Sequence, residues 1–295
     1  MTASPFDDIK ALIAGLPAAG PSSLTADPAL GRLGLIAAQL SRWSGPGKPR
    51  VLRPIVALYA GSHGDGEAEA LRARLELIAG GGAPINALAQ AAGAGLEAFD
   101  LAVEQPIGDI TSRAAMSERE CAATMAFGME ALAKQPDLLV LGDIVTGGQV
   151  SAAAIALALY GGEAEDWTEH AAERAGAAVS RMRAETGPQP APLEILRQLG
   201  GREIAAIAGA ILAARNQGVP VLLDGYGAAA AAAVLHAVDP EAIAHVMAGD
   251  RSPEPGHGRL LDRLGLKPIV ELGMGGEGCG AAAAVAIVRL ACELA

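Results

Sequence analysis

Glu277 stands between two glycines, in Gly276-Glu277-Gly278, and its residue type and position suggest chemistry. Two glycines favour a turn, but no turn requires a carboxylate between them. A carboxylate in an apolar cleft can serve as a general base, because burial raises its affinity for a proton. The alternative is an acidic residue that interacts with the N-terminal dipole of the following helix. We favour the general base.

Glu277 lies in one of five polar, glycine-containing loops, each of which follows an apolar segment predicted to be a strand. The loops cover residues 61–66, 142–149, 224–226, 249–257 and 273–280. In an open parallel sheet, ligands bind beyond the carboxyl ends of the strands. We therefore expect the acids, hydroxyl groups and histidines of these loops to gather in one site. The alternative is ordinary turn chemistry at each loop.

Two of these loops run directly into predicted helices. Residues 146–148 precede one helix, and residues 275–280 precede the last helix of the chain. A helix N-terminus presents free backbone N–H groups and the positive end of a dipole, which favours a bound phosphate or carboxylate. Glycines that only serve a tight turn would give the same pattern without a ligand.

Histidines and acids of the loops could in principle bind a metal ion. The candidates are His63, His257, Asp65, Asp143 and Asp250. No short ligand spacing of the kind found in zinc sites connects them, so we predict no metal site.

Apolar segments alternate with helical patterns through most of the chain. Strands are predicted at 54–60, 137–141, 219–223, 244–248 and 268–272, with a weaker candidate at 96–103. Helices are predicted at 117–134, 150–160, 202–216, 227–237 and 280–294. This alternation predicts an α/β fold with a parallel, Rossmann-like sheet that helices cover on both faces. No internal repeat is visible.

The predicted α/β domain is discontinuous in sequence. It comprises residues 51–161 and 201–295. Residues 162–200 are charged and contain no strand pattern, and residues 1–50 have helical character. We expect these two segments to form a small helical subdomain.

Composition excludes several classes of protein. The chain has 295 residues, of which 51% are hydrophobic, so a folded core is expected. With 22 basic and 33 acidic residues, the net charge of −11 argues against a nucleic-acid partner. Its apolar stretches fall short of the roughly 20 residues that span a membrane. Three cysteines in no disulfide pattern favour a cytoplasmic location.

Six segments in the same order resemble the nicotinate-nucleotide–dimethylbenzimidazole phosphoribosyltransferases of cobalamin assembly. They are residues 30–34, 80–86, 199–204, 220–226, 252–257 and 276–281. The resemblance runs from about residue 24 to residue 295. It implies an α/β homodimer that uses no cofactor. The implied reaction moves the phosphoribosyl group of nicotinate mononucleotide to a benzimidazole nitrogen and releases α-ribazole phosphate and nicotinate.

The resemblance also implies roles for individual residues. Glu277 matches the family's catalytic glutamate, and Asp143 matches a second acid of the site. The residues implied in phosphate and ribose binding are Gly147, Gly148, Ser252, Gly275, Gly276 and Arg174, the last where the family has a lysine. The residues implied in base binding are Ser62, His63 and Met274.

Departures from the family pattern leave alternatives open. Asp143 stands where the family has a glutamate, and Ser62 stands where the family has an acid. The Asn-Thr pair of the family motif that contains the glutamate is absent here. One alternative is a diverged paralogue that binds a nucleotide or azole without turnover. Another rests on residues 138–148, which resemble the motif of type I phosphoribosyltransferases that use phosphoribosyl diphosphate and magnesium.

Overall fold

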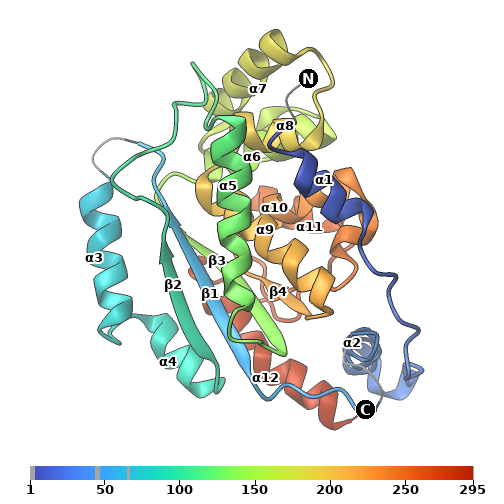
Figure 1. Ribbon diagram of the computed structural model, residues 1–295. Helices are drawn as coiled ribbons and strands as arrows, with labels where there is room; N and C mark the ends of the chain where they lie inside the picture. The colour runs from blue at the N-terminus through green and yellow to red at the C-terminus, as the bar shows by residue number, and fades with distance from the viewer. Residues whose placement is uncertain (1–3, 44–46, 65–66, 295) are drawn as a thin grey trace.

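A five-stranded parallel sheet forms the centre of the molecule (Figure 1). The computed structural model describes residues 4–43, 47–64 and 67–294. The strands are β1 Pro54–Gly61, β2 Gly95–Asp100, β3 Leu138–Val145, β4 Val221–Leu223 and β5 Val246–Ala248. They lie in the order β2-β1-β3-β4-β5, and every neighbouring pair is parallel. The predicted α/β fold with a parallel sheet is therefore confirmed.

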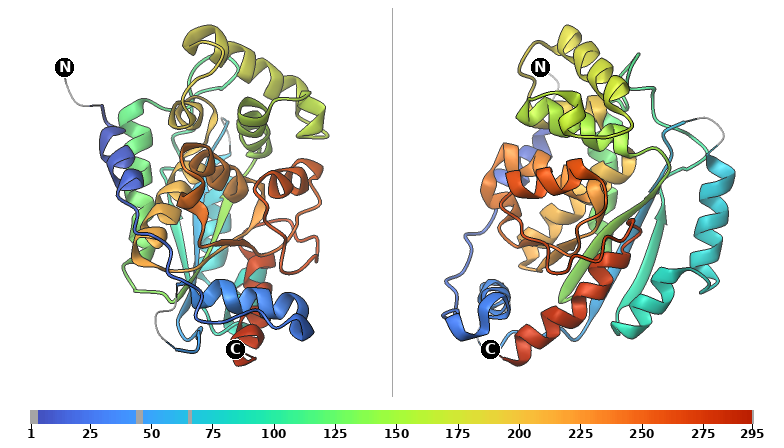
Figure 2. Two further views of the ribbon diagram at one scale, coloured as in Figure 1. Left: turned by 90° about the vertical axis from the view of Figure 1, so that its right-hand side faces the viewer. Right: turned by 180° about the vertical axis from the view of Figure 1, so that it is seen from behind.

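Helices cover both faces of the sheet (Figure 2). One face carries α1 Asp7–Ala14, α5 Glu118–Gly128, α6 Gln149–Tyr160, α7 Ala172–Thr186, α8 Pro192–Leu199, α9 Arg202–Gln217, α10 Gly225–Val238 and α11 Pro255–Arg263. The other face carries α2 Gly31–Ser41, α3 Ala68–Ala79, α4 Pro84–Ala91 and α12 Cys279–Glu293. Among the described residues, no helix is both long enough and apolar enough to cross a bilayer.

Strand β1, which lies between β2 and β3, shows why the sheet has two cores. Ile55, Ala57 and Tyr59 pack into one core, and Val56 and Leu58 pack into the other. Successive side chains of a strand point to opposite faces, so an unbroken apolar run is what a sheet covered on both sides requires. All eight residues of β1 are buried.

Small residues let the covering helices approach closely. A Cβ atom at Gly128 of α5 would lie 1.9 Å from the Ala206 carbonyl oxygen, and one at Gly209 of α9 would lie 1.8 Å from the Met125 carbonyl oxygen. The two helices therefore cross with backbone against backbone. A chain with 3% aromatic residues fills its core by this close approach rather than with large rings.

The predicted strand at 268–272 is wrong. This segment runs beside β5, where the Ile269 N–H donates to the Ala248 carbonyl oxygen and the Val270 N–H donates to that of Gly249. Both bonds come from consecutive residues, whereas N–H groups of consecutive strand residues point to opposite sides. The segment therefore leaves the sheet and continues as the loop that carries Glu277.

The two segments of the predicted helical subdomain have different main contacts. In residues 1–50, α2 packs chiefly against α12, and in residues 162–200, α7 packs chiefly against α6. The grouping of these segments into one subdomain stays a prediction.

Candidate active site

The strand order places the polar loops at the point where the sheet changes direction. From β1 the chain moves outward through α3 and α4 to β2, and then crosses by α5 to β3 on the other side of β1. Connections that leave in opposite directions open a crevice at the carboxyl ends of the two strands, where ligands of such sheets bind. The crevice lies between the ends of β1 and β3.

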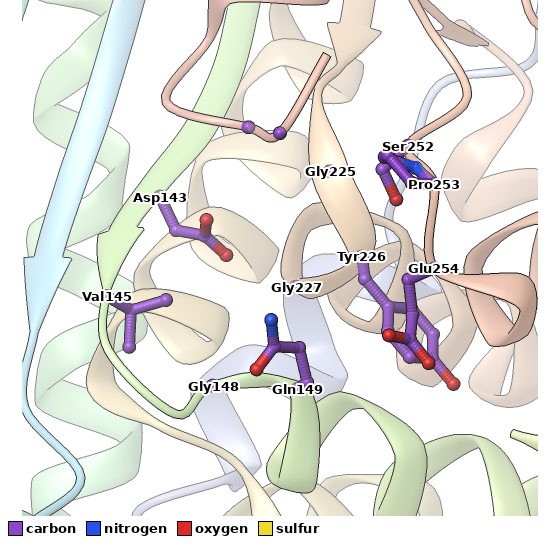
Figure 3. A pocket seen from close by; sticks show the side chains of 12 residues that line it. Asp143, Val145, Gly148, Gln149, Gly225, Tyr226, Gly227, Ser252, Pro253 and Glu254 are labelled. Carbon is purple, nitrogen blue, oxygen red and sulfur yellow. The ribbon is translucent and has the colours of Figure 1, made fainter. Parts of the chain in front are cut away.

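A cavity of about 320 Å³, here called the glycine cavity, lies at this edge. It is lined by Asp143, Val145, Gly148, Gln149, Gly225, Tyr226, Gly227, Ser252, Pro253, Glu254, Gly275 and Gly276. Figure 3 shows the side chains of Asp143 and Gln149 on one side of it, with Ser252, Tyr226 and Glu254 opposite. Four of the five predicted loops meet here, whereas His63 and Gly64 of the loop at 61–66 line a separate, smaller cavity.

Helix N-termini open onto the glycine cavity. Gly148 precedes α6, Gly225 begins α10 and Glu254 precedes α11, while Gly275 and Gly276 lie just before α12. Because α6, α10 and α11 each follow a parallel strand, their N-termini face the same edge of the sheet. Their free N–H groups and aligned dipoles favour an anion. No Lys or Arg is among the lining residues, which include the carboxylates of Asp143 and Glu254. An anion here would therefore be held by backbone N–H groups.

A second cavity of about 370 Å³, the Glu277 cavity, adjoins the first. The two share Asp143, Val145, Gly275 and Gly276, and the second adds Arg74, Pro84, Met274, Glu277 and Cys279. Glu277 has a left-handed φ of 55°, between Gly276 at 103° and Gly278 at 78°. Residues other than glycine rarely adopt this backbone conformation, because it is strained. Such strained residues are found most often at functional sites.

Two buried carboxylates hold the loop that carries Glu277. Asp224 accepts hydrogen bonds from the Gly278 N–H at 2.9 Å and the Ala281 N–H at 2.7 Å. Asp250 accepts from the N–H groups of Leu272 and Met274 at 2.8 and 2.9 Å. Burial raises the pKa of Asp224 to about 6 against the opposing effect of these bonds. The backbone around Glu277 is thus fixed from two strand ends.

Asp143 reaches both cavities from within β3, because the strand extends to Val145 rather than ending at residue 141 as predicted. A Cβ atom at Gly227 would lie 2.0 Å from Asp143 Oδ2, so the glycine makes room for the carboxylate beside the first turn of α10. Burial, followed by the nearby charges of Glu203 and Asp224, raises the pKa of Asp143 to about 7. The group can therefore change its charge near neutral pH.

Behind Asp143 lies a buried hydrogen-bonded cluster. His63 Nε2 is 2.8 Å from Glu203 Oε1, and His63 Nδ1 is 3.2 Å from Ser151 Oγ. Burial lowers the pKa of His63, but the charge and hydrogen bond of Glu203 outweigh it and raise that pKa above its ordinary value. A Cβ atom at Gly61 would lie 2.3 Å from Glu203 Oε2, which explains the glycine at the end of β1.

Comparisons with known proteins agree with this geometry. The sequence profile of a phosphoribosyltransferase family matches residues 21–295. A relative from Brucella melitensis, named nicotinate-nucleotide–dimethylbenzimidazole phosphoribosyltransferase, is 49% identical over 317 aligned positions that cover 97% of this chain and 93% of the relative. A relative of the same name from Brucella canis has the same identity and coverage. The chain belongs to the nicotinate-nucleotide–dimethylbenzimidazole phosphoribosyltransferase family.

A solved structure supports the same relationship. The phosphoribosyltransferase of this family from Thermus thermophilus superimposes with a TM-score of 0.84 and 30% identity, covering 98% of this chain and 94% of that one. The predicted resemblance is therefore confirmed over nearly the whole chain.

All but one of the predicted site residues of this phosphoribosyltransferase line three cavities. The glycine cavity contains Asp143, Gly148, Ser252, Gly275 and Gly276. The Glu277 cavity contains Glu277 and Met274, together with the shared residues. A smaller cavity of about 90 Å³ contains His63, Gly147 and Arg174. Ser62 is buried, and its hydroxyl has no hydrogen-bond partner among the described residues.

Sequence reasoning did not single out Arg74, Glu203, Tyr226 or Glu254, although all belong to the site or its support. Arg74 lies in a helix with other charged residues, so nothing in its spacing marks it. Within the described ranges, no three His, Cys, Asp or Glu side chains converge as metal ligands. Asp65, one of the residues considered for a metal, lies outside those ranges.

Proposed function

We propose that this phosphoribosyltransferase moves the phosphoribosyl group of nicotinate mononucleotide to a nitrogen of a benzimidazole base. The products are α-ribazole 5′-phosphate and nicotinate, used in assembling the nucleotide loop of cobalamin. The observation that carries the proposal is the shared wall between a cavity onto which helix N-termini open and a cavity that contains Glu277. The names of the relatives supply the two substrates.

The glycine cavity suits the phosphate and ribose of the donor. Gly148, Gly275 and Gly276 offer backbone at helix N-termini, and Ser252 offers a hydroxyl group. His257 Nδ1 lies 2.9 Å from Ser252 Oγ and accepts the Ser252 N–H, which fixes the hydroxyl at the cavity wall. We assign Gly147 and Arg174, in the small cavity beside Gly148, to the same ligand.

The Glu277 cavity suits the flat acceptor base. Pro84, Met274 and Cys279 supply apolar surface, and Glu277 supplies the proton acceptor. The reaction at C1′ joins one ring nitrogen of the acceptor to the ribose and breaks the bond to nicotinate, which leaves with the electron pair. Glu277 takes the proton from the other ring nitrogen. Holding both substrates across one wall aligns the attacking and leaving nitrogens about C1′.

Asp143, on the shared wall, lies where positive charge develops on the ribose. As an anion it would stabilise that charge in a site screened from water. The base-binding roles of Ser62 and His63 stay predictions, because neither lines the Glu277 cavity. His63 lines the small cavity with Gly64 and Gly147, and Ser62 is buried.

The packing of Gly142 argues against the type I mechanism. That mechanism needs two adjacent acids in the diphosphate–ribose motif, and here the first position is Gly142. A Cβ atom there would lie 2.8 Å from the Gly278 backbone nitrogen. An acidic side chain does not fit without moving the loop that carries Glu277.

The test is incubation with nicotinate mononucleotide and dimethylbenzimidazole, with mass detection of the new ribotide and of nicotinate. We expect Glu277→Gln to lower kcat by roughly 10²- to 10⁴-fold, the range of general base catalysis. Its Kd for nicotinate mononucleotide should stay unchanged. Glu271→Gln, at an exposed carboxylate six positions earlier, is the control and should retain the parent rate. Tight binding without product in the parent would instead favour the non-catalytic paralogue.

We further propose that the enzyme is a cytoplasmic homodimer. Its three cysteines are all free and buried, as is usual in a reducing compartment. Strand β2 forms an edge of the sheet, and all six of its residues are partly or fully exposed. Phe127, 44% exposed, contacts Phe99 of that strand. An uncovered edge strand beside an exposed ring favours association. A monomer mass in light scattering would contradict it.

A further inference from the structure

An arginine that lines the Glu277 cavity forms hydrogen bonds with the Glu277 carboxylate. Arg74 lies on α3 and forms a salt bridge with Glu277. Both side chains are about a quarter exposed, at 27% and 29%, and both line the cavity. Among the described residues, no other side chain forms a hydrogen bond with the Glu277 carboxylate. The orientation of this carboxylate therefore depends on a residue 203 positions away in sequence.

The contacts distinguish the two carboxylate oxygens. Arg74 Nε donates to Oε1 at 2.8 Å and to Oε2 at 3.0 Å, and Arg74 Nη2 donates to Oε2 as well. A carboxylate oxygen has two lone pairs that can accept hydrogen bonds. The single Nε–H proton is shared between the two oxygens, so Oε2 accepts from two nitrogens and Oε1 from one. Oε1 is therefore the more open of the two oxygens and keeps a free lone pair.

We propose that Arg74 is a positioning residue for the transfer reaction, which holds Glu277 so that the free lone pair of Oε1 meets the acceptor N–H. The inference rests on the proposed function. It requires no exchange of partners, because the planar guanidinium can keep its bonds while Oε1 accepts the proton. The paired hydrogen bonds from Nε and Nη2, here called the fork, fix the plane of the Glu277 carboxylate. The backbone of Glu277 is itself held in a left-handed conformation.

Two effects of Arg74 on the rate oppose one another. A positive charge beside a general base opposes the transfer of a proton to that base, which slows the step. The hydrogen bonds of Arg74 restrict the rotation of the Glu277 carboxylate, which speeds the step. Misplacement of a catalytic group by about 1 Å can cost on the order of 10²-fold in rate. Orientation therefore dominates, and loss of Arg74 should lower kcat.

The chain offers a matched control on the same helix. Arg72 forms an ion pair with Glu104, and its side chain and that of Glu104 are 52% and 61% exposed. Arg72→Met thus removes the same charge and the same kind of ion pair two positions away, outside the Glu277 cavity. We expect Arg72→Met to leave kcat, KM and donor binding unchanged.

The experiment is a double-mutant cycle of Arg74→Met with Glu277→Gln, measured as kcat with dimethylbenzimidazole. Arg74→Met should lower kcat by about 10- to 100-fold with an unchanged Kd for nicotinate mononucleotide, which also reports that the variant is folded. In the Glu277→Gln background the same change should have no further effect, because residues in one network are not additive. Arg74→Lys should recover part of the rate, since its single ammonium cannot form the fork.

Three outcomes would overturn the inference. An equal loss on removing Arg74 with and without Glu277 would show independent action. An unchanged kcat in Arg74→Met would show that Glu277 is oriented without it. A parent that makes no ribotide would overturn the proposed transfer and this role together, whereas the first two outcomes leave the transfer standing.

Discussion

At the scale of single residues, Asp143 is the group whose charge near neutral pH bears most on the reaction. Its pKa is raised to about 7, by burial first and then by Glu203 and Asp224. A carboxylate meant to stabilise positive charge must be ionised to act. The same burial that makes its charge effective thus restricts the pH range in which the charge is present.

The rate should follow this titration. With Asp143 protonated below pH 7, we expect kcat/KM to rise about tenfold per pH unit up to about pH 7 and to level off above it. In Asp143→Asn this rise should disappear along with most of the activity. Rate profiles between pH 5.5 and 9 measure both. A parent profile flat through pH 7 would remove Asp143 from the charge-stabilising role.

Stability should change in the opposite sense. An unfolded Asp ionises near its ordinary pKa of 3.8, whereas the folded one holds its proton to about 7. The free energy of unfolding therefore falls as pH rises between these values and stays low above pH 7. Asp143→Asn lacks this dependence, so its Tm at pH 8 should equal or exceed that of the parent. A lower Tm at pH 8 would mean that the ionised carboxylate stabilises the fold.

Sequence pattern reveals some of these residues and not others. Glu277 could be found because a carboxylate between two glycines has no structural reason to be there. Arg74 could not be found, because the sequence pattern of a helix with many charged residues does not indicate which of them faces a cavity. Only the position of α3 beside the loop that precedes α12 gives Arg74 its partner.

At the scale of elements, close contact between β3 and the loop before α12 sets the position of Glu277. A Cβ atom at Gly142 would lie 2.8 Å from the Gly278 nitrogen and 3.1 Å from its Cα. Both contacts are to backbone, so the loop itself must shift to admit a methyl group. Gly278 follows Glu277 directly, which makes the shift a displacement of the carboxylate.

Gly142→Ala should therefore lower kcat more than it lowers stability. We expect roughly a 10- to 100-fold loss of kcat, with about 1–3 kcal/mol lost from the free energy of unfolding. Gly176→Ala is the control, because a Cβ atom there meets only the Ala164 Cβ at 3.7 Å, an ordinary contact in α7. That change should leave kcat intact and stabilise slightly. Normal kcat in Gly142→Ala would show that the loop adapts.

Elements with a strong local pattern could be predicted from the sequence. The helices expected at 150–160 and 202–216 appear at Gln149–Tyr160 and Arg202–Gln217. The segment at 268–272 has the same apolar look as a strand, yet it leaves the sheet. Whether this segment becomes a strand depends on its hydrogen bonds with β5, and the amino-acid composition does not reveal these.

At the scale of the whole molecule, an anion could bind at either of two edges of the sheet, the one at the carboxyl ends of the strands or the one at their amino ends. The carboxyl edge has helix N-termini and few cations. The amino edge has a cavity of about 480 Å³ lined by Lys48, Arg50 and Arg289. Two of these cations are already engaged, because Lys48 contacts Glu293 and Arg289 donates to the Val51 carbonyl oxygen. We therefore expect the donor phosphate at the carboxyl edge.

Hydrogen exchange with nicotinate mononucleotide tests this arrangement over the entire chain. Binding should slow amide exchange at 146–149, 225–227, 252–254 and 274–278, because these segments come from separate loops around the glycine cavity. Since ligand binds only the folded state, a concentration of 100 times Kd should add about 2.7 kcal/mol to the free energy of unfolding. Residues 48–52 should exchange at the same rate with and without ligand. Protection at 48–52 without protection at 274–278 would move the donor to the amino edge, where Glu277 cannot reach it.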